Sequence, residues 1–246
     1  FLVRDDDIPA FLATDVCQLG ILGQNVLLEK QAQSNGIFSS LEQRLPIGHG
    51  KCRLSIAVPH DFTYNSIASL NGKVIATSYK GLLGQYLDSK NISADIVTME
   101  GAVEVAPRTH LADVICDLVS TGSTLSSNGL VEKDVVMQSQ AVLVTNQISD
   151  PEIAAIADKI TSRLQAVLRA ENSRYIMLNS PTKSLDAIKA VLPGSQSPTV
   201  MPLQGCDDMV AVHAVCEEGV FWDTMEDLKV CGANSILVVP IEKMLD

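Results

Sequence analysis

Residues 120–124 gather four hydroxyl side chains around one glycine, in the order Ser120, Thr121, Gly122, Ser123 and Thr124. The apolar run 114–119 comes directly before them and contains one acid, Asp117. Such a run is typical of a buried strand, and the loop after it can offer backbone N–H groups, hydroxyls and a helix start to a phosphate. The spacing and lysine of a Walker A loop are absent. On composition alone, an ordinary strand-to-helix connection capped by Ser and Thr is the simpler interpretation.

A second pair of charged residues, Glu104 and Arg108, lies shortly before this strand, ahead of a helix expected over residues 109–112. The four-residue spacing alone favours a simple ion pair on a helix surface. Near a phosphate-binding loop, the same arginine could neutralise pyrophosphate, and the glutamate could contact a ribose or a base.

The elements around these residues follow an alternating order. Residues 52–58, 74–77 and 94–98 are predicted strands, and residues 81–89 a helix. Alternation of strands and helices predicts a mostly parallel α/β sheet, whose ligands bind at the carboxyl ends of its strands. Thr77, Glu104 and the 120–124 loop would all lie at that edge.

Composition limits the classes of function. A chain of 246 residues with 46% hydrophobic and 19% charged residues is expected to form more than one compact unit. The net charge of −11 argues against general nucleic-acid binding, and no apolar run approaches the ~20 residues of a membrane span. The six cysteines show no C-x-x-C spacing, which predicts free thiols in a reducing cytosol rather than a zinc site.

The last third of the chain has its own pattern. Residues 151–167 form a helix with one apolar stripe, and the elements after it follow the order β-α-β-β-α-β. That order predicts a separate ferredoxin-like domain. His213 falls inside one of its strands and is expected to be a packed core residue rather than a ligand.

Six motifs in order along the chain closely resemble the ATP phosphoribosyltransferase family, in its long form. They are residues 4–9 (RDDDIP), 19–26 (LGILGQNV), 52–55 (CRLS), 70–79 (LNGKVIATSY), 103–108 (VEVAPR) and 117–125 (DLVSTGSTL). The resemblance implies a two-lobed catalytic part built like a periplasmic binding protein, followed by a ferredoxin-like (ACT-like) regulatory domain. The family begins with a further strand and a basic loop that nothing here matches, so we expect residues to be missing before Phe1.

The resemblance implies a reaction in which ATP and phosphoribosyl pyrophosphate give phosphoribosyl-ATP and pyrophosphate, the first step of histidine biosynthesis. Mg²⁺ neutralises the leaving group, and no metal ligands can be named from the sequence. The catalytic residues would be Glu104 and Asp117. Substrate would be held by Asp117 on the ribose and by the phosphate loop, with further contacts nearby: Ser120, Thr121, Gly122, Ser123, Thr124 and Leu125, then Thr77, Tyr79 and Arg108.

The resemblance also implies regulation and an assembly. Histidine would inhibit by binding the C-terminal domain, at Asn179, Ser195, Thr199 and Ala233, and homo-oligomers would exchange between dimer and hexamer in the cytoplasm. The expected domains are a first lobe (1–51 and 145–172), a second lobe (52–144) and the regulatory domain (173–246). A non-enzymatic two-lobed protein that binds a small ligand is the alternative, although it would need neither the phosphate loop nor a regulatory domain.

Overall fold

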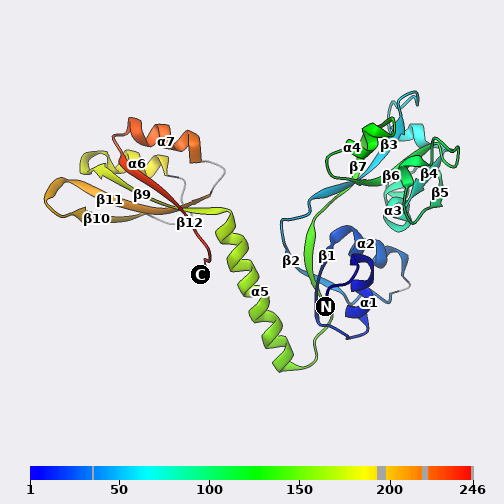
Figure 1. Ribbon diagram of the computed structural model, residues 1–246, viewed down its shortest axis with the longest axis horizontal. Coiled ribbons are helices and arrows are strands. Elements are labelled where there is room, and N and C mark those ends of the chain that lie inside the picture. The colour runs from blue at the N-terminus through cyan, green and yellow to red at the C-terminus, as the bar shows by residue number, and fades with distance from the viewer. Residues whose placement is uncertain (35, 193–197, 218–220, 245–246) are drawn as a thin grey trace. The chain divides into compact units, whose positions relative to one another are not determined.

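The structure is a computed structural model that describes residues 1–34, 36–192, 198–217 and 221–244 (Figure 1). Contacts divide the chain into two compact units, Phe1–Ala157 and Asp158–Asp246. The division falls within the long helix α5 (Pro151–Glu171), whereas the sequence predicts a boundary after residue 172. The first unit is built on two sheets and the second unit on one.

The first lobe is an antiparallel sheet of three strands in the order β1-β8-β2. Its elements are β1 (Leu19–Gly23), β2 (Glu42–Pro46), β8 (Ala141–Thr145), α1 (Ile8–Ala13) and α2 (Gln24–Gln33). The core between them consists of Leu12, Leu22, Val26, Leu27, Leu41, Val142 and Val144. Because β8 finds its backbone partners on β1 and β2, the chain has already returned to this lobe at Ala141, earlier than the expected boundary at residue 144.

The second lobe is a sheet of five strands in the order β5-β4-β6-β3-β7. Its elements are β3 (Cys52–Pro59), β4 (Val74–Thr77), α3 (Lys80–Ser89), β5 (Asp95–Thr98), β6 (Val114–Val119), α4 (Ser123–Ser127) and β7 (Leu130–Ser139). Strand β4 runs parallel to β5 and β6, as expected, but β3 is antiparallel to β6 and β7. The reason is that the chain enters the second lobe along β3 and returns to the first lobe along β7, so these two neighbouring strands run in opposite directions.

The parallel strands place the predicted substrate residues at one edge. Thr77 is opposite Thr98 and Cys116 in the register of β4 with β5 and β6. The segments that follow β4, β5 and β6 therefore leave the sheet at the same edge. The helix expected over residues 109–112 is absent: a 3-10 helix over Val103–Val105 is followed by turns, and His110 has φ +57°, which an α-helix does not tolerate.

The second unit has the expected ferredoxin-like topology. Its elements are β9 (Ser173–Pro181), α6 (Leu185–Val191), β10 (Thr199–Leu203), β11 (Cys206–Glu217), α7 (Phe221–Val230) and β12 (Asn234–Pro240). The strands pair antiparallel in the order β10-β11-β9-β12, and both helices lie on the same side of the sheet (Figure 1). Ile188 and Leu228 from the two helices pack with Ile176 and Val212 of the sheet.

Candidate active site

The predicted phosphate loop follows strand β6 directly, as the sequence indicates. Val119 ends the strand, Gly122 has φ +82°, and α4 begins at Ser123. Only this left-handed conformation favours glycine here, because a Cβ would have room: it would meet only Val119 Cγ1, at 3.9 Å. The four hydroxyl residues of the loop are exposed, while Leu125 is buried and anchors the loop to the lobe.

The backbone of this loop offers unused hydrogen-bond donors. Within the described chain, the N–H groups of Thr121, Gly122 and Thr124 have no acceptor. The Thr121 and Ser123 hydroxyls lie 3.0 Å apart and hydrogen-bond to each other. Because α4 has only five residues, the helix dipole contributes little, and the loop amides and hydroxyls supply what positive potential there is.

Glu104 and Asp117 converge at the same edge. Burial raises the pKa of the Asp117 carboxyl, and the negative charge of Glu104 raises it further, against a hydrogen bond from the Leu118 N–H at 2.8 Å. An acid whose charged form is disfavoured by burial and by a second acid is common at functional sites. The structure therefore brings together the two residues that were predicted to be catalytic.

The three other predicted substrate residues are placed differently from one another. Thr77 is fully buried, and its hydroxyl accepts a hydrogen bond from the Tyr79 N–H at 2.9 Å. The Tyr79 hydroxyl accepts a hydrogen bond from the Asn25 side chain of the first lobe at 3.0 Å, and burial raises its pKa to about 12. Arg108 is exposed on the turn after the 3-10 helix, and among the described residues it forms no hydrogen bond or ion pair with the loop.

Helices α2 and α3 join the two lobes beside Tyr79. The carboxylate of Glu29, on α2, accepts hydrogen bonds from the N–H groups of Gly81 and Leu82 at 2.7 and 2.8 Å, so it caps the start of α3. Glu29 is only 6% exposed. The first turn of α3 is thus already occupied by a carboxylate of the same chain, whereas backbone N–H groups of the 120–124 loop have no acceptor within the described chain.

Sequence reasoning gave no role to an ion pair beside the loop. Arg53 on β3 and Glu132 on β7 form a two-armed ion pair, and a third arm of the Arg53 side chain reaches the Ser120 carbonyl. One signal was present: Arg53 is a charged residue in a strand whose other members are mainly buried.

The predicted effector residues do not all converge. Asn179 and Thr199 lie on the sheet face opposite α6 and α7, whereas Ala233 is buried near α7. Ser195 lies outside the described residues. His213 is not a core residue: it is half-buried on the same open face, and its Nδ1 lies 2.7 Å from the Tyr175 hydroxyl.

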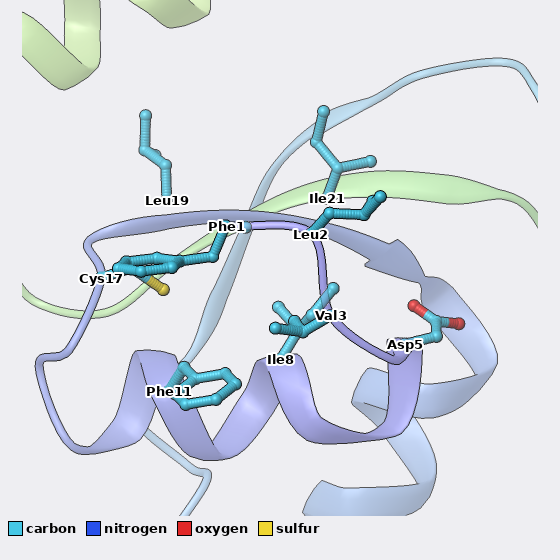
Figure 2. A pocket seen from close by; sticks show the side chains of 10 residues that line it. Phe1, Leu2, Val3, Asp5, Ile8, Phe11, Cys17, Leu19 and Ile21 are labelled. Atoms are coloured by element: carbon cyan, nitrogen blue, oxygen red, sulfur yellow. The ribbon is translucent and has the colours of Figure 1, made fainter.

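A separate cavity of about 400 Å³ lies in the first lobe, between β1, α1 and the first residues of the chain (Figure 2). Its lining is mainly apolar and comprises Phe1, Leu2, Val3, Asp5, Ile8, Phe11, Cys17, Leu19, Gly20 and Ile21. It contains none of the predicted substrate residues.

Two family models match the chain. The model of ATP phosphoribosyltransferase matches residues 4–166, and the model of the HisG C-terminal domain matches residues 170–243. An ATP phosphoribosyltransferase of Maricaulis maris is 48% identical over 245 residues, which cover 99% of this chain and 83% of that protein.

In the part of the chain that the structure describes, no helix is both long and apolar enough to cross a membrane.

Solved structures agree with these matches. An ATP phosphoribosyl transferase (HisG:HisZ) complex from Thermotoga maritima is similar with a TM-score of 0.57 and 30% identity, over 69% of this chain and 79% of that one. XAC2383 from Xanthomonas citri, solved with ATP bound, has a TM-score of 0.50 at 15% identity, over 68% and 70% of the two chains, and shows the fold alone. Together with the two-lobed α/β unit and the ferredoxin-like domain, these matches confirm that the chain belongs to the ATP phosphoribosyltransferase family, in its long form.

Proposed function

We propose that this pentosyltransferase binds phosphoribosyl pyrophosphate at the edge formed by β4, β5 and β6, and that residues 120–124 hold its 5-phosphate. The observation that carries the proposal is the set of unpartnered amides and exposed hydroxyls directly after Asp117. The buried Leu125 side chain anchors this loop to the lobe. Asp117 and Glu104 then face the ribose, and Arg108 reaches the pyrophosphate from its exposed turn.

The reaction needs positioning and charge stabilisation rather than a protein nucleophile. The adenine N1 of ATP forms a bond to the anomeric carbon, while the bond from that carbon to the pyrophosphate oxygen breaks and its electron pair leaves with pyrophosphate. Positive charge develops on the ribose in the transition state. The carboxylates of Asp117 and Glu104 stabilise that charge, and the loop holds the ribose still at its other end.

The donor set suits Mg²⁺ that arrives with the substrate. Among the described residues, no group of three or more His, Cys, Asp or Glu side chains is arranged to hold a metal. The carboxylates of Asp117 and Glu104 do suit an ion that takes its remaining ligands from phosphate and water, since the charge of Glu104 disfavours the charged form of Asp117. Asp117 and Glu104 are therefore the residues that would contact it, and Mg²⁺ would supply neutralisation of the leaving pyrophosphate.

Loss of single loop hydroxyls is expected to weaken the binding of phosphoribosyl pyrophosphate. For Ser123→Ala and Thr124→Ala we expect the KM for this substrate to rise about tenfold each, because each loses one hydrogen bond to a charged group. The KM for ATP should change by less than about twofold. Ser126→Ala, an exposed serine on α4 just beyond the loop, is the matched control. Unchanged KM values in both loop variants would contradict the proposed phosphate site.

We further propose that histidine inhibits the enzyme through the second unit, and that the protein forms dimers and hexamers in the cytoplasm. The proposal is supported by the ferredoxin-like fold, by the C-terminal family match, and by a relative that was solved as a complex. Histidine should lower the initial rate and should lose potency in Asn179→Ala. Rates measured with histidine, alongside light scattering, test both parts; a rate that histidine leaves unchanged contradicts the regulatory role.

A further inference from the structure

Arg53 ties the phosphate loop to strand β7. Its Nε and Nη2 donate to the two carboxylate oxygens of Glu132, each at 2.5 Å, and its Nη1 donates to the carbonyl oxygen of Ser120 at 3.2 Å. The Ser55 hydroxyl donates to Glu132 Oε1 at 2.8 Å. Two parallel bonds fix the plane of the guanidinium, and its remaining arm is then aimed at the first residue of the loop.

The bond to Ser120 also orients the next backbone amide. In a trans peptide the carbonyl and the N–H point in opposite directions, so a carbonyl held by Arg53 turns the Thr121 N–H away from Arg53. That N–H is one of the donors without an acceptor in the described chain. A cationic donor on the carbonyl polarises the peptide and makes its N–H a stronger donor to an anion.

Arg53 is unsuited to bind the phosphate itself. Two of its three nitrogens are committed to Glu132, and these hydrogen bonds hold the pKa of the Glu132 carboxyl below its ordinary value. The carboxylate therefore stays charged at neutral pH and balances the guanidinium charge. The hydrogen bond to the Ser120 carbonyl is therefore the direct contact through which Arg53 acts on the loop.

We propose that Arg53, oriented by Glu132, is a positioning residue that sets the affinity of the 120–124 loop for the 5-phosphate. The inference rests on the phosphate role proposed for that loop. It assigns part of the substrate affinity to a residue that does not contact the substrate.

The test is steady-state kinetics of the full chain with each substrate varied in turn. Arg53→Met should raise the KM for phosphoribosyl pyrophosphate about tenfold or more, with the KM for ATP and kcat within about threefold of the parent. Arg53→Lys should restore part of the loss, because an ammonium can still donate to Ser120 but cannot form the fork with Glu132. The KM of Glu132→Gln for phosphoribosyl pyrophosphate should lie between those of Arg53→Met and Arg53→Lys. Lys133→Met, an exposed cation beside Glu132, is the control for loss of charge and should behave as the parent.

The outcomes separate this inference from the proposed function. If Ser123→Ala and Thr124→Ala raise the KM for phosphoribosyl pyrophosphate but Arg53→Met and Arg53→Lys do not, the positioning role is wrong and the phosphate loop stands. An equal rise in both KM values, or a fall in kcat alone, would also overturn it in favour of a purely structural ion pair. If the loop variants themselves have no effect, the proposed function fails first. Should Arg53→Met not fold, Arg53→Lys and Glu132→Gln give the same comparison.

Discussion

The Asp117→Asn variant is expected to lose about 10²-fold or more of its transferase activity while its catalytic unit becomes harder to unfold. The loss follows because an amide cannot stabilise positive charge on the ribose. The gain follows because burial and the Glu104 charge both raise the pKa of Asp117, so the charged carboxylate is destabilised in the folded protein. An asparagine Oδ1 can still accept the Leu118 N–H. We expect the free energy of unfolding to rise by about 0.5–2 kcal/mol, the usual size of a single stabilising substitution.

The sign of the pH dependence follows from the direction of the shift. The pKa of Asp117 is higher in the folded state than its ordinary value of 3.8, so the carboxylate lowers stability at every pH above the raised pKa. The penalty shrinks as the pH falls through the folded pKa and is absent below 3.8, where both states are protonated. The stability difference between Asp117→Asn and the parent should therefore be full at neutral pH and vanish near pH 3.

Calorimetric unfolding across this pH range, with activity measured at neutral pH, checks the prediction. Each kcal/mol corresponds to about 2–4 °C in the unfolding midpoint for a unit of this size. Asp113→Asn is the matched control, because Asp113 precedes the start of β6, at the opposite end of the strand from the loop, and its carboxylate accepts the Val74 N–H at 2.8 Å. It should lower stability slightly and leave activity intact. A less stable Asp117→Asn protein would contradict the account of this site.

Local patterns predicted the elements well. The strand over residues 114–119 and the order of the ferredoxin-like unit follow from apolar runs broken by turn residues, which act within a few positions of one another. The direction of β3 does not follow from such a run, because it depends on which lobe the chain comes from. The start of α1 shows the same limit. Asp7 stands at the N-cap position, where a carboxylate usually caps the first turn, yet it makes no side-chain cap, and Asp5 instead accepts the Gly23 N–H at 3.0 Å.

The candidate site likewise contains one part that a local sequence pattern predicts and other parts that only the fold brings together. The 120–124 loop is contiguous, so its composition alone pointed to it. Arg53 and Glu132 are separated by most of the second lobe in sequence, and only the antiparallel pairing of β3 with β7 brings them together. Glu29 and Gly81 belong to different lobes and meet only through the packing of α2 on α3. Contacts of this kind have no sequence period, which is why they were not predicted.

Replacing Glu29 is expected to have the largest effect on stability among the residues near the site. Glu29→Ala would leave the half-buried first turn of α3 without its cap, and the N–H groups of Gly81 and Leu82 would lose their acceptor. Two charge-assisted bonds and their unsatisfied donors together amount to about 2–4 kcal/mol of unfolding free energy. Because α3 begins one residue after Tyr79, kcat/KM should also fall, by about tenfold. Denaturant unfolding of the full chain and steady-state kinetics give the two measurements.

Two glycines of α3 provide a matched test of the same contact. A Cβ at Gly81 would lie 2.7 Å from the Cβ of Ala32 on α2, so Gly81→Ala should force the helices apart and cost about 1–3 kcal/mol. Gly84 lies in the same helix with nothing within 4 Å of its Cβ position, so Gly84→Ala should stabilise the helix by about 0.5–1 kcal/mol. Helix propensity would favour alanine at both positions alike. Changes of opposite sign in the free energy of unfolding would therefore show that the close α2–α3 contact contributes to stability. Two stabilising substitutions would show that stability does not depend on this contact.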